Sequence, residues 1–396
     1  MKKKYNIAID ARFLLRQQRG MPLYAFMLCK HIPQILSEHQ FFLFINEGFE
    51  HNDKIENYQK RLAIFQHYNN VTLINANAED EISWEQKTLP KLIEKHDIDL
   101  LHMPGNRVCL NTKVKQIVTF HDAMEWTHLS FFSSYEINKG IRNLIYSLKM
   151  KCYRGLTYFL GMKKVDKILT ISQYSKDALC DEFPAIKNKT VFAHHGIPEG
   201  FSNPSNINPI EHRQGILMLG GDSFQKNPEN TLRAWALLPD TLKANFPLTI
   251  AGFTGGETSP LMQTLIELGI RDKVTILGWI TSQQLIELFQ STYLFLFASR
   301  IEGFGFPLLQ AMSCGTPTLC SKADVLLEIG TNAIVSAEAE SPELLKEQLL
   351  KVLSSQALWQ ELHENSLVRA KDFEWEKTCK FIAQTYLNLL GENKSL

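Results

Sequence analysis

Short runs of apolar residues recur along the chain and are separated by segments long enough for helices. Continuous apolar runs of four to six residues are typical of parallel strands that are covered on both faces. The alternation therefore predicts an α/β fold with doubly wound sheets. The predicted strands cover residues 5–9, 41–45, 71–74, 100–103, 116–120, 167–172, 191–195, 216–220, 248–252, 274–278, 293–299 and 316–320. In the helix-length stretch 21–36, Pro33 predicts a break or a kink.

One segment interrupts this pattern. Residues 203–215 are rich in Asn and Pro and lack apolar periodicity, which is typical of a linker. A chain of 396 residues also exceeds the usual size of a single core. We expect two Rossmann-like domains that face each other across a cleft, residues 1–205 and 206–375. An amphipathic helix at about 376–396 either closes the second domain or packs back on the first.

The amino-acid composition indicates which classes of partner and cellular location are expected. Lys and Arg number 42, as do Asp and Glu, so the net charge gives no argument for a nucleic-acid partner. Seven dispersed cysteines without a CxxC pair indicate reduced, mostly buried thiols of a cytosolic protein. Asp10 and Arg12 cut the first apolar run too short for a signal peptide, and no run of about 18 apolar residues predicts a membrane span.

A second amphipathic segment lies at residues 141–164. Its apolar side chains fall on one helical stripe, and several Lys and Arg lie nearby. One interpretation is a peripheral contact with anionic lipid headgroups on the inner face of the cytoplasmic membrane. The other is an ordinary core helix with a solvated basic face. The sequence leaves both open.

The stretch SRIEGFGFPLLQAMSCGTP, residues 299–317, connects a predicted strand to a predicted helix. Pro307 suits the first turn of that helix, and Gly315 can end it. The turn IEGFGF therefore lies at the carboxyl edge of the sheet, where doubly wound folds bind ligands and helix N–H groups favour phosphate.

Two polar residues bracket this turn. Glu302 is expected to be free to accept hydrogen bonds from hydroxyls, and Gln310 to lie on the opening face of the helix. Gly303 and Gly305 allow close approach of the backbone, although a tight turn without a ligand would also need them. A ligand with phosphates in its middle and hydroxylated rings at both ends fits this arrangement, as a nucleotide sugar does.

The stretch LMLGGDSFQKNPENTLRAWALL repeats the strand, glycine turn and helix. Gly221 lies in the turn and Lys226 just before the helix, where it can neutralise phosphate charge. Asn227 is a candidate N-cap, and Pro228 suits the first helical position.

Two candidates lie in the first half. His121 and Asp122 directly follow the strand at 116–120, although a single histidine is more often structural than catalytic. Arg12, Gly20 and Tyr24 surround the first strand–helix connection. The motif DID at 97–99 precedes its strand and so lies at the wrong edge for a ligand, and no metal site is predicted.

With these motifs in order, the chain resembles the retaining glycosyltransferases of family 4, which have the GT-B fold. The resemblance spans nearly the whole length. It includes IAIDAR, TFHD, TISQYSKDAL, HHGIPEGF, LGGDSFQKN and the run from LGWITSQQ to EGFGFPLLQAMSCGTP. It implies that the second domain binds the nucleotide sugar and that the first presents the acceptor.

The resemblance also implies a role for each candidate. Glu302 and the backbone of Gly303, Phe304 and Gly305 would meet the donor sugar and phosphates, Lys226 the pyrophosphate and Gln310 the ribose. His121 would meet the donor sugar near the reacting carbon, and Gly20 would approach the diphosphate. No metal or other cofactor is implied, since lysine and helix amino ends do a cation's electrostatic work.

Three positions depart from the family pattern. Gln310 replaces the second glutamate of the E-x7-E pair, Gln225 replaces the usual arginine before the lysine, and Pro22 replaces a common loop glycine. Neutral Gln310 should bind ribose more weakly than a carboxylate, because charge-assisted hydrogen bonds are roughly twice as strong. The departures bear on donor affinity more than on fold.

The leading hypothesis is a cytoplasmic hexosyltransferase that uses a UDP- or GDP-sugar. Its acceptor would be a glycan or lipid-linked glycan of surface polysaccharide or lipopolysaccharide assembly. Mannose is favoured by the resemblance alone. The alternative is a non-catalytic nucleotide-sugar-binding or scaffolding relative with a degraded donor site. A GT-B epimerase or phosphorylase fits the motifs less well.

Overall fold

The computed structural model describes residues 3–48, 53–121, 141–201, 207–392 and 396, and residues 141–151 by their backbone alone. The chain divides into two compact units. The first contains Met1–His195 together with Trp375–Leu396, and the second contains Gly196–Glu374. The second unit thus starts ten residues before the predicted boundary at position 206. The predicted linker, residues 203–215, belongs to the second unit.

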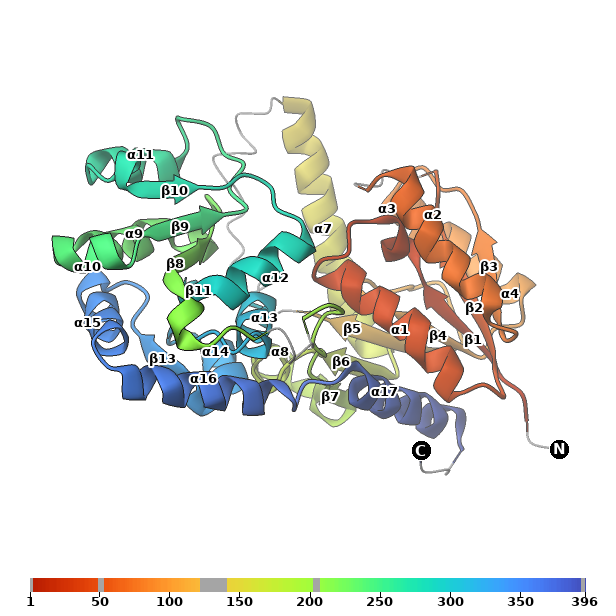
Figure 1. Cartoon of the computed structure of the whole chain (residues 1–396). Coiled ribbons are helices and arrows are strands. Elements are labelled where there is room, and N and C mark those ends of the chain that lie inside the picture. Colours follow the sequence, from red (N-terminus) through yellow and green to blue (C-terminus); the bar gives the residue numbers. More distant parts are fainter. Residues whose placement is uncertain (1–2, 49–52, 122–140, 202–206, 393–395) are drawn as a thin grey trace. The chain divides into compact units, whose positions relative to one another are not determined.

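The first unit is built on a seven-stranded parallel sheet with the order β3-β2-β1-β4-β5-β6-β7. Its strands are β1 (Asn6–Asp10), β2 (Gln40–Ile45), β3 (Val71–Asn75), β4 (Leu100–Met103), β5 (Lys115–Phe120), β6 (Lys167–Thr170) and β7 (Thr190–Phe192). Its main helices are α1 (Met21–Ile35), α2 (Ile55–Ile64), α4 (Leu89–Lys95), α7 (Ile141–Lys164), α8 (Gln173–Glu182) and α17 (Trp375–Leu390) (Figure 1).

The second unit is built on a six-stranded parallel sheet with the order β10-β9-β8-β11-β12-β13. Its strands are β8 (Gln214–Leu219), β9 (Leu248–Ala251), β10 (Val274–Ile276), β11 (Thr292–Phe297), β12 (Thr318–Ser321) and β13 (Ile334–Ala337). Its helices are α9 (Pro228–Ala236), α10 (Asp240–Asn245), α11 (Pro260–Glu267), α12 (Ser282–Ser291), α13 (Phe306–Ser313), α14 (Asp324–Gly330), α15 (Pro342–Leu353) and α16 (Gln356–Ala370).

Burial explains why the apolar runs become strands. Every residue of β4 and of β11 is buried, as expected for parallel strands covered by helices on both faces. Large aromatic side chains fill the two cores, with Trp84 fully buried in the first and Trp235 and Trp359 in the second. Burying an aromatic or aliphatic side chain stabilises a fold by roughly 1.5–3 kcal/mol, so these cores hold the strand ends in place.

The C-terminal helix returns to the first unit. Helix α17 lies beside α1 (Figure 1), and its Cys379, Ile382 and Tyr386 are fully buried. The Tyr386 hydroxyl lies 2.5 Å from Nδ1 of His102 on β4. The Tyr5 hydroxyl also donates to the Leu390 carbonyl at 3.0 Å. Of the two destinations that the sequence allowed for this helix, the structure shows the first unit.

Most predicted elements are confirmed. Each predicted strand corresponds to an observed one, and β13 is an additional edge strand, only half of whose residues are buried. The break predicted at Pro33 is wrong, because α1 continues to Ile35 and the proline lies in its last turn, where only one helical hydrogen bond is lost. All seven cysteines are free, and Cys152 alone among them is exposed.

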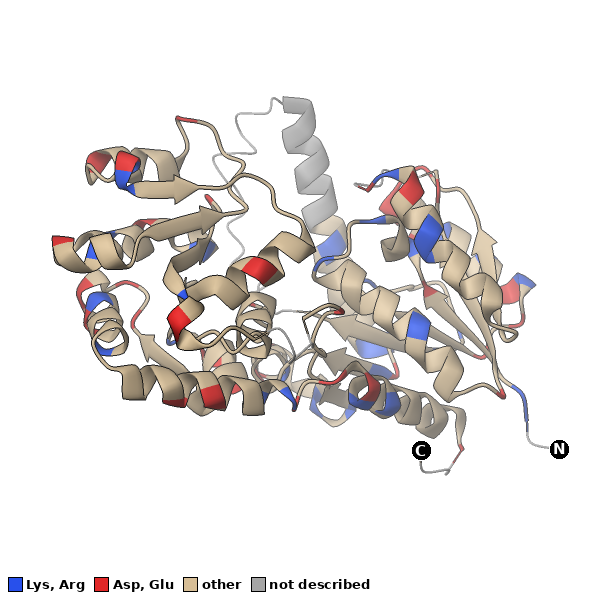
Figure 2. Ribbon diagram, viewed as in Figure 1, with Lys and Arg blue, Asp and Glu red and all other residues tan. Residues whose placement is uncertain are grey.

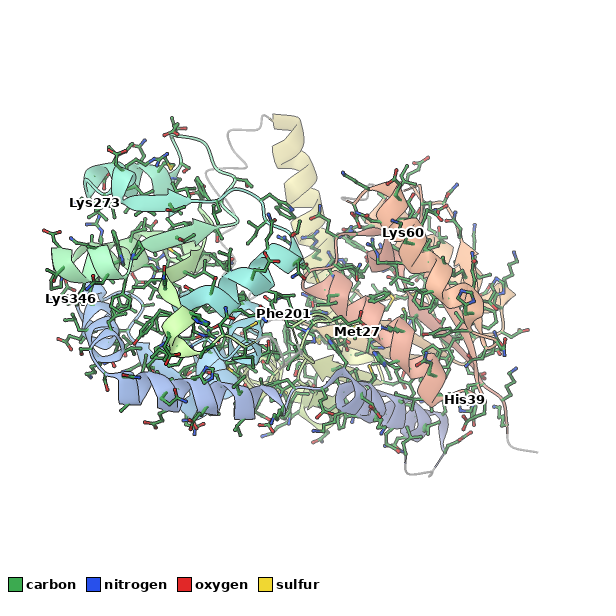
Figure 3. All side chains as sticks on the ribbon, in the orientation of Figure 1. Met27, His39, Lys60, Phe201, Lys273 and Lys346 are labelled. Carbon is green, nitrogen blue, oxygen red and sulfur yellow. The ribbon has the colours of Figure 1, made fainter. Side chains whose placement is uncertain are left out.

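Charged residues of both signs occur in both units. Basic and acidic positions are interspersed on the helices of both units (Figure 2), in line with their equal numbers. Polar side chains project outward around the sheets while side chains such as Met27 on α1 are buried (Figure 3). Among the residues described above, we find no helix with the length and hydrophobicity needed to cross a bilayer.

Candidate functional site

The second sheet changes direction between β8 and β11. These strands are neighbours, yet the chain proceeds outward from β8 to β9 and β10 and then from β11 to β12 and β13. At such a switch point, the loops after the two strands diverge and leave a crevice at their carboxyl ends. The loop from Gly220 to Asn227 follows β8, and the loop from Ala298 to Gly305 follows β11.

An ion pair joins these two loops. Nζ of Lys226 donates a hydrogen bond of 2.7 Å to Oε1 of Glu302. The ammonium group also lies 5.4 Å from the ring centroid of Phe297 at the end of β11. The lysine side chain is 36% exposed and the glutamate side chain 12%. One oxygen of Glu302 thus already accepts a hydrogen bond from the lysine, and the expected hydrogen bonds to ligand hydroxyls stay a prediction for its remaining lone pairs.

Arg300 braces the same two loops. Its backbone N–H donates to the Gln225 carbonyl at 2.8 Å, and its Nη1 donates to the Phe224 carbonyl at 2.6 Å. The guanidinium lies 4.2 Å from the Phe224 ring centroid and pairs with Glu340. These contacts fix the segment that carries Lys226.

Asn227 holds the start of α9. It adopts the left-handed conformation with φ of 54° and is fully buried. It occupies the N-cap position of α9, as predicted, but its side chain makes no capping hydrogen bond. Instead its Nδ2 donates to the carbonyls of Ala298 at 2.9 Å and Ala339 at 2.7 Å. The asparagine thus ties the β8 loop to the end of β11, one residue away from Lys226.

The glycine turn leads directly into α13. Gly305 has φ of 92°, and a Cβ there would lie 2.7 Å from Leu326 Cδ2, so only glycine fits. Pro307 lies in the first turn of α13, as predicted. The Phe304 side chain is buried, with its ring centroid 5.3 Å from that of Phe306. Gly303 lies between Glu302 and this buried ring and is half-buried.

Gln310 lies in the second turn of α13. The residue is half-buried, and its side-chain amide has no hydrogen-bond partner within the described parts of the chain. Gly221 lies in the opposite loop, where a Cβ would be 3.3 Å from Cγ of Lys226. A pocket of about 140 Å³ at the ends of β8 and β11 is lined by residues that include Lys226, Ser299 and Pro307.

The first unit holds His121 directly after β5. The residue is 5% exposed. Its backbone N–H donates to Oδ1 of Asn106 at 2.7 Å, and its Nε2 lies 2.7 Å from the Pro104 carbonyl oxygen. Since a carbonyl only accepts, Nε2 carries the proton and Nδ1 is left as an acceptor. Burial lowers the pKa of His121 to about 4, so the ring is neutral at pH 7.

A buried aromatic and polar network supports this histidine. The Tyr24 ring packs edge-on against His121 with centroids 5.0 Å apart. The Tyr24 hydroxyl lies 2.9 Å from Oγ1 of Thr119, which lies 2.8 Å from Nε2 of His102. Through Tyr386 this chain of contacts reaches α17. It fixes the end of β5 from two helices.

The remaining predicted positions belong to the connection after β1. Gly20 precedes α1, has φ of 53° and is exposed. Pro22 lies in the first turn of α1, where its missing N–H costs nothing, so this departure from the family pattern is compatible with the helix. Asp122 lies outside the described residues. Within those residues, no three His, Cys, Asp or Glu side chains are grouped as metal ligands.

The structure thus brings Gly221, Lys226, Glu302, the glycine turn and Gln310 to one edge of the second sheet, while Gly20 and His121 lie in the first unit. Arg300 is a residue of this site that the sequence motifs do not predict. The residue stands beside the glycine turn in the sequence, but its partners are up to 76 residues away, and no local pattern indicates them.

Helix α7 presents an apolar stripe to solvent. Leu156, Phe159 and Leu160 are 57%, 56% and 43% exposed, whereas Tyr158 and Met162 on the same helix are buried. Lys163 lies next to this stripe, with its Nζ 4.7 Å from the Phe159 ring centroid. The helix therefore has one apolar face in the core and a second apolar face on the surface.

Two family models match successive parts of the chain. The model for Glycosyltransferase Family 4 matches residues 19–200, and the model for Glycosyl transferases group 1 matches residues 203–369. The chain is 31% identical over 222 residues to O-antigen chain mannosyltransferase B of Escherichia coli. That match covers 53% of this chain and 57% of the relative, so it spans little more than half of either protein.

Solved structures share the fold over nearly the full length. WaaG, a glycosyltransferase involved in lipopolysaccharide biosynthesis, superposes with a TM-score of 0.68 at 14% identity and covers 96% of this chain and 99% of its own. Anabaena Alr3699/HepE in complex with UDP and glucose gives a TM-score of 0.68 at 16% identity, with 97% and 99% covered. These likenesses confirm the predicted α/β fold with two doubly wound domains, that of the GT-B proteins.

Proposed function

Because the chain belongs to the group 1 glycosyltransferases and carries a family 4 domain before the group 1 domain, we propose that it is a retaining, metal-independent hexosyltransferase. Its donor would be a UDP- or GDP-sugar. Its acceptor would be a glycan or lipid-linked glycan of surface polysaccharide or lipopolysaccharide assembly. The observation that carries the proposal is the pairing of Lys226 with Glu302 at the switch point of the second sheet.

The donor would lie over the two helix starts at this edge. Helices α9 and α13 both begin there, and their first N–H groups and positive dipole ends favour the pyrophosphate. Lys226 adds a full positive charge, and the Gly303–Gly305 backbone permits close approach of the donor. Glu302 would accept hydrogen bonds from sugar hydroxyls with the lone pairs that Lys226 leaves available. The Gln310 amide would bind ribose hydroxyls.

His121 would meet the donor sugar as a neutral group. Because Nε2 donates to the Pro104 carbonyl, only Nδ1 is available as a hydrogen-bond acceptor. The buried ring is held rigid by Tyr24, so its contribution would be orientation of the sugar. Developing negative charge on the leaving nucleotide would be stabilised by Lys226 and the helix starts, which supply electrostatic catalysis in place of a metal ion.

Mannose is the favoured sugar, supported by the similarity to an O-antigen chain mannosyltransferase. A uridine nucleotide is supported by a fold neighbour that was solved with UDP and glucose. We also propose that the exposed stripe of α7 lies on an anionic membrane surface, where the acceptor of a lipid-linked pathway would be found. Apolar side chains next to Lys163 and Lys164 fit such a surface by both hydrophobicity and charge.

A nucleotide panel tests the proposal. UDP, GDP, ADP and their sugars are added to the full chain, and the shift of its unfolding transition is measured. A ligand at about 100 times its Kd stabilises the folded state by roughly 2.7 kcal/mol. The selected sugar nucleotide is then incubated with glycan acceptors, and the anomeric configuration of the product is read by NMR. Binding without transfer to any acceptor would favour the scaffolding alternative, and no response to any nucleotide would overturn the donor site.

A further inference from the structure

The first sheet has a switch point of its own. Strands β1 and β4 are neighbours, with β2 and β3 on one side and β5 to β7 on the other. The crevice expected at the carboxyl ends of these two strands is a preferred ligand site in doubly wound sheets. Arginines gather there from three elements. Arg12 and Arg16 follow β1, Arg107 follows β4, and Arg154 lies on α7. We call these four residues the arginine cluster.

The guanidinium group of Arg12 is already paired with carboxylates of the protein. Its Nη2 pairs with Oδ2 of Asp10 at 2.7 Å, and its Nε donates to Oδ1 at 3.0 Å. Its Nη2 also lies 3.3 Å from Oε1 of buried Glu85. The Trp84 indole donates to the same aspartate at 3.2 Å. This arginine is a structural member that anchors the cluster to β1.

Arg107 and Arg154 contact Glu81 at longer distances, although Arg107 also donates to the Asn106 carbonyl at 3.0 Å and lies 3.4 Å from Oε1 of Glu85. Both point to Oε2 of Glu81, at 3.4 Å and 3.6 Å, beyond the usual range of a hydrogen bond. That oxygen accepts no hydrogen bond from any described residue, although it is buried. Nε of Arg154 is likewise buried without a hydrogen-bond partner in the described chain. The Nε–H of Arg154 is thus a buried donor without an acceptor, which is costly unless a ligand oxygen completes its hydrogen bond. The Glu81 oxygen is itself an acceptor, so an anion does not satisfy it.

Arg16 lies close to the other cations. Burial lowers the pKa of its guanidinium, and the positive charges of Arg12 and Arg107 lower it further. It is half-buried, and no carboxylate of a described residue lies within ion-pair distance of it. Its guanidinium lies 5.4 Å from the Phe13 ring centroid. It is therefore the member of the cluster best able to accept an anionic partner.

The cluster carries more positive than negative charge. Four arginines face three acidic residues, Asp10, Glu81 and Glu85. Burial raises the pKa of Glu85 in spite of the arginines, and the Tyr153 hydroxyl donates to its Oε2 at 2.7 Å. Glu85 lies in a single π-helical turn, Trp84–Thr88, a local irregularity that is frequent at functional sites. The guanidinium groups are therefore concentrated at the carboxyl edge of the first sheet, where a ligand is expected. With four arginines and three acidic residues, the net charge of the cluster is at least +1.

We infer that the arginine cluster binds an oxyanion of the acceptor, either a phosphoryl or a carboxylate group, with Arg16 and Arg154 as its direct contacts. The planar guanidinium fork matches both groups in geometry and remains charged at every physiological pH. The identification of the anion's carrier as the acceptor rests on the proposed function. The anion site itself rests only on the first unit.

Small probes test the site without knowledge of the acceptor. Binding of benzyl phosphate to the full chain is followed by broadening of its ³¹P NMR signal, with benzyl alcohol as the neutral control observed in its proton spectrum. Arg16→Gln and Arg154→Gln should each weaken benzyl phosphate binding about tenfold, the effect of losing one charge-assisted contact. Lys60→Gln on α2 (Figure 3) removes one exposed charge from the same unit and should leave binding unchanged.

Two further measurements show where benzyl phosphate binds and which class of anion the site accepts. Lys226→Ala should retain benzyl phosphate binding, because it alters only the other unit, and loss there would place the probe in the donor site instead. Phenylacetate carries the same ring with a carboxylate. Its displacement of benzyl phosphate identifies a general oxyanion site, and its failure to compete restricts the site to phosphoryl groups. Unchanged binding in the folded Arg16→Gln, Arg154→Gln double variant would overturn the inference. Anion binding without sugar transfer from any donor would count against the proposed function alone.

Discussion

Lys226 and Glu302 are 76 positions apart in the sequence, yet Nζ of the lysine donates a 2.7 Å hydrogen bond to Oε1 of the glutamate. They meet because β8 and β11 are adjacent strands of a sheet that changes direction between them. Each residue follows its strand through a short turn that ends in a helix start. The pair therefore connects the two helix ends at which we place the phosphates of the donor.

Replacing either member of this pair should abolish transfer without unfolding the protein. Lys226→Ala and Glu302→Ala are each expected to lower kcat/KM by about 100-fold or more, since electrostatic groups at a developing charge contribute roughly that much. Their effect on the free energy of unfolding should stay near 0–1 kcal/mol, the usual value for a partly exposed ion pair. Steady-state kinetics and urea unfolding measure the two quantities separately.

A charge reversal provides the matched control. The double variant Lys226→Glu with Glu302→Lys again places opposite charges at the two positions but exchanges the cation and the carboxylate. Stability should return to that of the unmodified protein, while transfer should remain as low as in the single variants. Recovery of transfer in the double variant would show that the pair is only a structural link between the loops.

Asn227 should determine whether the loop that carries Lys226 forms at all. Asn227→Ala removes two donated hydrogen bonds to the carbonyls of Ala298 and Ala339 and places alanine in the left-handed region. Unsatisfied buried groups cost about 1–3 kcal/mol each, so we expect a loss of roughly 3 kcal/mol or more in the free energy of unfolding. Asn227→Gly relieves the backbone strain and should lose less. Equal stability of the alanine variant and the unmodified protein in urea unfolding would contradict this account.

The strands and turns of the proposed donor site follow from local sequence, whereas the contacts between its loops do not. The apolar runs, the glycines and Pro307 determine where a strand ends and a helix begins, and all of these are visible in a window of a few residues. The ion pair of Lys226 with Glu302 and the brace from Arg300 depend on which strands become neighbours. Strand order is a property of the whole sheet, and the alternation of elements does not specify it.

Asn227 shows the same limit at the level of one residue. Its position before Pro228 is typical of an N-cap, and the helix does begin there. Its side chain nevertheless bonds two carbonyls from distant segments, because the tertiary structure buries it between them. The arginine cluster was missed for a related reason, since its members come from widely separated segments and only Arg12 follows a strand closely enough to be noticed.

Restoring the missing carboxylate should strengthen nucleotide binding. Gln310→Glu places a negative charge where family 4 enzymes commonly have one, and a charged acceptor makes stronger hydrogen bonds to ribose hydroxyls. The Gln310 amide has no partner among the described residues, so its replacement breaks no hydrogen bond of the protein. We expect the Kd for the preferred nucleotide to fall about threefold to tenfold in calorimetry, and Gln310→Met to raise it. Identical affinities for the unmodified protein and both variants would show that Gln310 does not contact the nucleotide.

The protein should become less stable in mild acid. Burial lowers the pKa of His121 to about 4 and that of His102 to about 3, below the usual 6.5. Between pH 6.5 and pH 4, the unfolded chain therefore binds more protons than the folded one. The stabilisation is fully present above pH 6.5 and is lost as the pH falls, at up to about 1.4 kcal/mol per pH unit for each histidine. Urea unfolding at pH 7, 6, 5 and 4.5 measures this slope.

A histidine variant separates this effect from the titration of carboxylates. His102→Gln keeps a polar side chain between Thr119 and Tyr386 but cannot titrate. Its unfolding free energy should depend less steeply on pH between 6.5 and 4.5, by up to one proton. The same slope in both proteins would mean that His102 is not protonated on unfolding in this range.

The exposed stripe of α7 should bind the full chain to anionic membranes. Substituting Leu156, Phe159 and Leu160 together with serine removes the apolar surface while the buried face of the helix keeps Tyr158 and Met162. Because burial of such side chains contributes roughly 1.5–3 kcal/mol each, co-sedimentation with vesicles that contain phosphatidylglycerol should weaken at least tenfold. Lys163→Gln should reduce binding less, and only at low ionic strength. Val368→Ser, which removes an exposed apolar side chain from the second unit, is the matched control. Sedimentation of the triple serine variant at the level of the unmodified chain would refute the membrane contact and leave the stripe as an ordinary surface feature.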